Sequence, residues 1–169
     1  MSATLARIDR LALALARGLA LAGGALLLGL IAMVVISVAG RASGIGPVRG
    51  DYELIELGAG LAVFAFLPWC QITGGHARVD VLTHSLPPAV RRGLDLLWDV
   101  VMAVAMVVIA WRLGAGTASK LASGETSFLI GLPIGWAYAA ALVAAVAAAG
   151  VAAWIALAGA LRLVTGAAA

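Results

Sequence analysis

Two carboxylates, Glu53 and Glu56, stand at the start of a long apolar segment, close to Asp51. A carboxylate held deep in a membrane is a candidate site for proton coupling. These acids lie at the edge of the apolar segment instead, where water and lipid headgroups solvate an ionised group. Their position favours capping of a helix and contact with a partner over proton coupling.

The two histidines, His76 and His84, fall in one polar stretch that also contains Asp80. Haem ligation in a helical membrane protein needs histidines within the helices, and a zinc site needs more ligands than Asp80 adds. The single cysteine, Cys70, excludes an intramolecular disulfide and a cysteine-only metal site. We therefore expect no metal and no cofactor in this chain.

Arg112 is the one charged residue well inside an apolar segment. Its long side chain could snorkel toward the nearer membrane surface. Alternatively, it pairs with a neighbouring helix or subunit, since charges inside a membrane usually face protein. The sequence contains no phosphate-binding loop, nucleophile elbow or helical metal-binding motif. It therefore gives no indication of an enzyme.

The composition requires a lipid environment. Of the 169 residues, 64% are hydrophobic and 11% are charged, and the mean hydropathy is +1.11. A soluble domain of this size cannot bury so much apolar surface. The net charge of +3 comes from scattered basic residues without a basic stripe, so nucleic acid is not an expected partner.

The apolar runs predict an all-α integral membrane protein, a single four-helix domain over residues 1–169. The transmembrane helices are expected at about 16–40, 54–73, 94–118 and 133–163. The first run also resembles a signal peptide, but it is longer than the apolar region of such a segment, which favours a retained helix.

The distribution of basic residues predicts the orientation. Seven lie at the two termini and the second link, and four lie on the opposite side; these are Arg7, Arg10, Arg17, Arg78, Arg91, Arg92 and Arg162, against Arg41, Arg49, Arg112 and Lys120. Because cytoplasmic segments carry the excess of basic residues, both termini are predicted to be cytoplasmic.

Two further features stand out. Between the second and third helices, apolar and polar residues alternate over residues 78–86, which predicts a short interfacial segment. The fourth helix is long enough to require tilting and is rich in alanine, which allows close helix packing in lipid. Alternatively, alanine serves there only as a generic apolar residue.

Two stretches resemble a known family. The first is Gly75-His76-Ala77-Arg78-Val79-Asp80-Val81-Leu82, followed by Ser85-Leu86-Pro87 and preceded by Glu53; the second runs from Glu125 to Tyr138 and includes Gly131-Leu132-Pro133. With the four spans, they resemble the small membrane subunit (DctQ type) of tripartite ATP-independent periplasmic (TRAP) transporters, over roughly residues 10–160. Ile130 and Leu132 depart mildly from the usual residues.

The resemblance implies an accessory permease subunit in the bacterial inner membrane. Such a subunit braces a large permease subunit for sodium-coupled uptake of an organic acid delivered by a periplasmic solute-binding protein, and the sodium ions are expected on the large subunit. The matched stretches suggest the contact residues Glu53, His76, Arg78, Asp80, Ser127, Pro133 and Trp136. We also expect Arg112 and the small-residue face of the fourth helix to lie toward the large subunit, with lipids as further partners.

Two other functions compete with this one. An autonomous small transporter, acting as a homodimer, requires a deeply buried carboxylate, and the sequence places none deep. A membrane redox enzyme requires a haem or metal centre, for which the histidines are poorly placed. The transported solute is not encoded in any of these patterns.

Overall fold

The computed structural model describes residues 3–76 and 87–165, except for the side chains at 3–5, 88–89, 162 and 164–165. It contains four α-helices, α1 (Ala3–Ala42), α2 (Asp51–Ile72), α3 (Pro88–Ser123) and α4 (Ile134–Thr165). All four are long and apolar enough to cross a membrane. The prediction of an all-α, four-span membrane protein is confirmed.

Two of the helices, α1 and α3, extend well beyond the bounds expected from the apolar runs. α1 begins at Ala3, well before the predicted start at 16. The helical backbone continues where the side chains become charged, and the Arg10 side chain adds a bond of its own, since its Nε donates to the carbonyl of Ala6. With 40, 36 and 32 residues, α1, α3 and α4 all exceed the roughly 20 residues that a bilayer requires. The expected length of α4 is therefore shared by α1 and α3.

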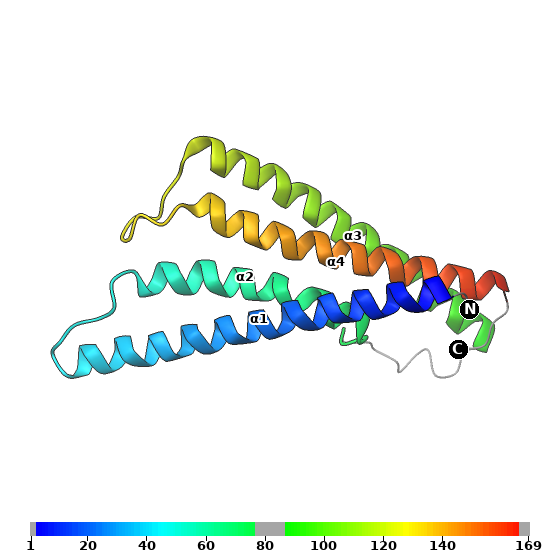
Figure 1. The fold of residues 1–169 in the computed structure, drawn as a ribbon, viewed down its shortest axis with the longest axis horizontal. Coiled ribbons are helices and arrows are strands. Elements are labelled where there is room, and N and C mark those ends of the chain that lie inside the picture. Colours follow the sequence, from blue (N-terminus) through cyan, green and yellow to red (C-terminus); the bar gives the residue numbers. More distant parts are fainter. Residues whose placement is uncertain (1–2, 77–86, 166–169) are drawn as a thin grey trace.

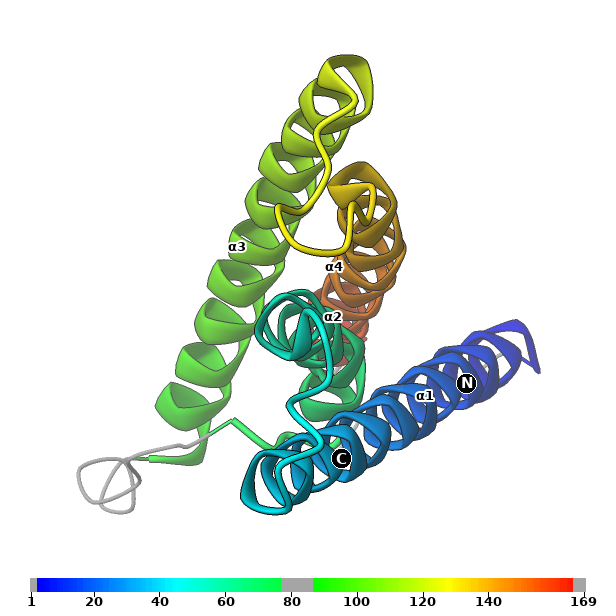
Figure 2. The same cartoon turned by 90° about the vertical axis from the view of Figure 1, so that its left-hand side faces the viewer.

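The helices are arranged as two pairs that meet through α2 and α4 (Figure 1). α1 packs on α2, α3 packs on α4, and α2 lies against α4, whereas α1 touches α4 only lightly. Viewed along the bundle, α1 and α3 diverge to opposite sides of the central α2 and α4 (Figure 2). α1 and α3 consequently expose the most apolar surface.

The core is built mainly from alanine. One cluster joins Ala103, Met106 and Ala110 of α3 to a row of alanines on α4, namely Ala145, Ala148, Ala149, Ala152 and Ala156. Small side chains allow two helix backbones to approach closely, and this packing drives helix association in lipid. The prediction that this face of α4 lies toward a larger subunit is wrong, because α3 and α2 already cover it.

A close backbone approach also joins α1 to α2. A Cβ added to Gly23 would lie 3.0 Å from the Cβ of Ala65, closer than side chains normally pack. A polar contact joins α1 to α4: the Trp154 Nε1 donates a 2.7 Å hydrogen bond to Asp9 Oδ1. This bond ties the start of α1 to the last part of α4.

Candidate functional site

One end of the bundle carries both the α1–α2 connection (residues 43–50) and the α3–α4 connection (residues 124–133); we call it the loop end (Figure 1). The start of α1 and the finish of α4 lie at the opposite end. Most of the described residues with predicted contact roles gather at the loop end, which is therefore the candidate site.

The α3–α4 connection folds back on itself as a small hairpin. Ser127 organises it, because its N–H donates to the Leu132 carbonyl at 2.8 Å and its Oγ accepts from the Leu132 N–H at 3.0 Å. An isolated β-bridge pairs Thr126 with Pro133, and the Ile134 N–H donates to the Glu125 carbonyl. The Lys120 ammonium, 2.5 Å from the Glu125 carboxylate, ties the hairpin to the end of α3.

Glu53, in the first turn of α2, holds the tip of this hairpin. Its two carboxylate oxygens accept hydrogen bonds from the N–H groups of Leu129, at 2.6 Å, and Ile130, at 3.2 Å. Successive N–H groups in a turn form a concave site that favours an anion. The carboxylate also suits the positive end of the α2 dipole. Glu53 therefore joins the two helix pairs at the loop end.

Gly50 brings α2 close to the same hairpin. Its φ of 72° lies in the left-handed region, which glycine adopts without steric cost. An added Cβ would overlap the Ile130 side chain. Both the backbone angle and the close approach therefore require glycine at this position.

A second polar cluster closes the α1–α2 connection. The Ser37 Oγ, on a residue only 1% exposed, donates to Asp51 Oδ2 at 2.5 Å and accepts from the Val48 N–H at 3.2 Å. The Arg41 guanidinium pairs with the same Asp51 carboxylate and donates to Ser37. This cluster fixes the end of α1 to the start of α2.

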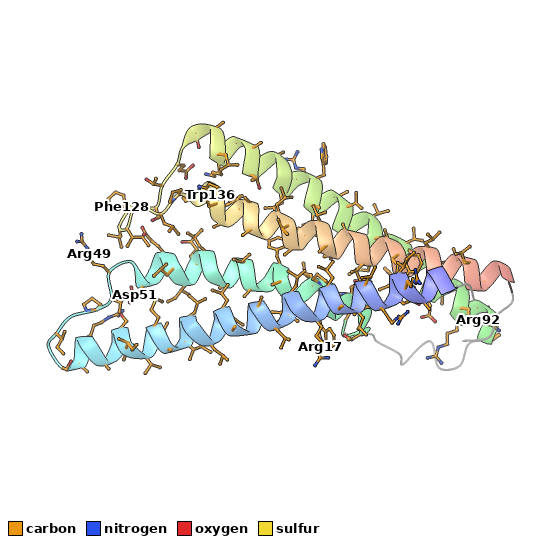
Figure 3. All side chains as sticks on the ribbon, viewed as in Figure 1. Arg17, Arg49, Asp51, Arg92, Phe128 and Trp136 are labelled. Carbon is orange, nitrogen blue, oxygen red and sulfur yellow. The ribbon has the colours of Figure 1, made fainter. Side chains whose placement is uncertain are left out.

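Exposed apolar side chains lie around the contact between Glu53 and the hairpin and around the polar cluster at Asp51. Phe128, at the hairpin tip, is 97% exposed, and Ile45, in the other connection, is 87% exposed. Tyr52 and Trp136 are also mostly exposed, and Arg49 extends from the same end of the bundle as Phe128 and Trp136 (Figure 3). We call Ile45, Tyr52, Phe128 and Trp136 the apolar rim. Aromatic side chains next to an arginine are typical of contact surfaces between proteins.

His76 lies at the other end of α2, away from the loop end. Its Nε2 lies 2.7 Å from Gln71 Oε1, and its Nδ1 lies 3.7 Å from Cys70 Sγ. Within residues 3–76 and 87–165, no group of three or more potential ligand residues could hold a metal ion. His76 thus forms local contacts and is not brought together with Glu53.

The other predicted residues are distributed as follows. Ser127, Pro133 and Trp136 lie with Glu53 at the loop end. Arg112 lies within α3, where its side chain is exposed and its Cζ is 5.7 Å from the centroid of the Trp111 ring. Arg78, Asp80, His84 and the predicted interfacial segment lie outside the described residues.

Sequence reasoning missed Ser37 and the pair formed by Asp9 and Trp154. Ser37 is a small hydroxyl residue within an otherwise apolar run, and that isolated polarity is the signal that could have identified it. A buried hydroxyl needs a hydrogen-bond partner. The bond from Trp154 to Asp9 joins residues 145 positions apart, and no local sequence pattern predicts it.

One family model matches most of the chain. The family model for the DctQ component of tripartite ATP-independent periplasmic transporters matches residues 30–166. The chain belongs to the DctQ family. The match runs from within α1 to beyond the end of α4, so it includes Glu53 and the hairpin that Glu53 holds. Among curated proteins and solved structures, none matches the chain.

Membership identifies this DctQ protein as a transporter component, of a family that is not an enzyme family. The system to which the family belongs is tripartite, with a large permease and a binding protein as the other components. Four membrane-spanning helices and this family fit a multi-pass inner-membrane protein.

Proposed function

We propose that this chain is the small permease subunit that braces the large permease subunit of a TRAP transporter, during sodium-coupled uptake of an organic acid. It binds no cofactor of its own in this proposal, and the sodium ions bind to the large subunit. The chain acts as a fixed scaffold, contacting the large subunit, the periplasmic binding protein and membrane lipids.

The hydrogen bonds that the Leu129 and Ile130 N–H groups donate to Glu53 are the observation that carries this proposal. They connect the α1–α2 pair to the α3–α4 pair at the loop end, while the bond from Trp154 to Asp9 connects α1 to α4 at the other end. A subunit whose helix pairs are tied at both ends suits a bracing role better than a moving one. A moving element needs contacts that open at low cost.

The exposed surfaces support the presence of partners. α1 and α3 present long apolar faces, consistent with lipid and a larger membrane subunit around them. The apolar rim, by contrast, belongs to loops and helix ends at the membrane surface. We propose that the rim contacts the periplasmic binding protein or the extracytoplasmic side of the large subunit.

This proposal places the loop end in the periplasm and both chain termini in the cytoplasm. α1 begins and α4 finishes at the same end of the bundle (Figure 1), and the excess of basic residues favours the cytoplasm for that end. A C-terminal reporter that is active only in the cytoplasm tests this orientation. Activity only in the periplasm would invert it.

Co-purification and reconstitution test the function. The tagged chain is expected to retain a larger membrane protein after mild detergent extraction. Proteoliposomes that contain both proteins and the binding protein are expected to take up an organic acid down a sodium gradient. Proteoliposomes with the chain alone are expected to show no uptake, and uptake by the lone chain would overturn the proposal in favour of an autonomous transporter.

A further inference from the structure

Arg112 lies on the side of α3 that faces away from the rest of the bundle. Ala103, Met106 and Ala110 bury the opposite side of α3 against α4. The outer face of α3, as we call it, is a continuous stripe of exposed residues at helical spacing: Val104, Val107, Val108, Trp111, Arg112 and Ala115. Arg112 is the one charge on this stripe.

No acidic side chain in the described part of the chain pairs with Arg112. Asp51 pairs with Arg41 and Glu125 pairs with Lys120, whereas Arg112 contacts the ring of Trp111, its neighbour in sequence. A guanidinium exposed to hydrocarbon is costly, and charges inside membranes usually face protein or a water-filled cavity. The arginine therefore needs an anion from outside the described part of this chain.

The geometry of α3 disfavours a lipid phosphate as that anion. Lys120 is the next charged residue toward the loop end, eight residues after Arg112, or about 12 Å along the helix axis. This is a long distance for the Arg112 side chain to reach by snorkelling. The Cα–Cβ bonds of a helix tilt toward its N-terminus. The Arg112 side chain therefore starts out toward the bilayer centre, away from the nearer surface at the loop end.

We propose that Arg112 forms an ion pair inside the membrane with a carboxylate on a transmembrane helix of the large permease subunit, which packs along the outer face of α3. This inference rests on the proposed function. The valines and alanine of the stripe give a transmembrane helix a surface without long side chains. Trp111 covers one side of the guanidinium, whose planar fork matches a carboxylate through two parallel hydrogen bonds.

Photo-crosslinking tests the contact in the intact complex. A benzoylphenylalanine residue replaces Val108, one turn before Arg112 on the same stripe, in tagged chain that is co-expressed with the large subunit. We expect the crosslink to reach a transmembrane segment of the large subunit that contains Asp or Glu. A crosslink to phospholipid alone would show that lipid covers this face, and would overturn the inference.

Charge substitutions test the ion pair itself. Arg112→Glu is expected to lower the amount of co-purified large subunit by at least about tenfold, because it leaves two carboxylates unpaired in the membrane. Arg112→Lys is expected to lose less. Arg17→Glu reverses an exposed charge on α1 and is expected to leave the yield unchanged. A carboxylate-to-Arg substitution in the crosslinked segment is expected to restore assembly with Arg112→Glu.

The outcomes separate this inference from the proposed function. If the unaltered chain fails to retain a large subunit, the proposed function itself fails. If the unaltered chain assembles, and Arg112→Glu assembles equally well, the ion pair alone is overturned. Thermal unfolding of the isolated Arg112→Glu chain is expected to match that of the unaltered chain, so that a folding defect cannot imitate the loss of assembly.

Discussion

The carboxylate of Glu53 accepts hydrogen bonds from the N–H groups of Leu129 and Ile130, 76 and 77 residues further along the chain. The Ser127 side chain and the Phe128 backbone also interact with this carboxylate. One side chain on α2 thereby holds the tip of a hairpin that otherwise bonds within itself and to the end of α3. The arrangement keeps the most exposed aromatic residue of the loop end, Phe128, in a defined position.

Replacing Glu53 with Gln is expected to loosen the hairpin without unfolding the helices. The neutral amide accepts weaker hydrogen bonds than a carboxylate and offers one acceptor oxygen. Hydrogen exchange at the Leu129 and Ile130 amides should accelerate by roughly tenfold. Glu56→Gln changes an exposed carboxylate on the same helix and should leave this exchange unaltered. Equal protection in both variants would contradict the proposed anchoring.

Removing the Ser37 hydroxyl is expected to destabilise the α1–α2 connection. Ser37→Ala leaves the Val48 N–H without its acceptor and removes one of the donors to Asp51, which keeps Arg41 and the Tyr52 N–H. A buried polar group left unpaired costs about 1–3 kcal/mol. Thermal unfolding of the purified chain in detergent measures the loss. Ser43→Ala removes an exposed hydroxyl that bonds only to helix carbonyls, and it should shift the melting temperature much less.

The alanine core is expected to reject larger side chains. Ala152 is fully buried, whereas Ala153, the next residue, is exposed. Ala152→Leu should destabilise the chain by about 1–3 kcal/mol because the added carbons force α3 and α4 apart. Ala153→Leu adds the same atoms to an exposed surface and should have little effect. Similar unfolding curves for the two variants would argue against the α3–α4 packing described above.

Trp154→Phe is expected to release the start of α1 from α4. The substitution keeps an aromatic ring but removes the Nε1–H that donates to Asp9. The loss of one partly buried hydrogen bond costs about 1 kcal/mol. Spin labels at Ile8 and Leu157, both exposed, should report a broader distance distribution. Trp98→Phe, on an exposed part of α3, is the matched control and should leave the distribution narrow.

Phe128→Ser is expected to affect the complex more than the isolated chain. At 97% exposure, the ring contributes little to folding, so the unfolding temperature should change by no more than the effect of about 0.5 kcal/mol that is usual for surface substitutions. If the apolar rim contacts a partner, reconstituted uptake should fall several-fold. Val143→Ser, on an exposed part of α4 outside the rim, serves as the comparison. Unchanged uptake would remove Phe128 from the proposed contact.

The number of spans, the helical class and the family could all be predicted from the residues alone. Long uncharged runs can satisfy their backbone polar groups in lipid only as helices. The stretches around His76 and Pro133 indicated the family without any structure. The sequence also placed Glu53 at a helix start and Ser127 and Pro133 in the link before α4, although it gave no reason for them to meet.

Which helix faces pair with one another could be learned only from the packed structure. In lipid, buried and exposed helix faces are equally apolar, so periodicity does not separate them. For this reason the alanine face of α4 was assigned to an external partner, whereas it packs on α3 and α2 within the chain. The hydrogen bond that the Leu129 N–H donates to Glu53 could not be predicted either, since it depends on how distant segments pack rather than on local order.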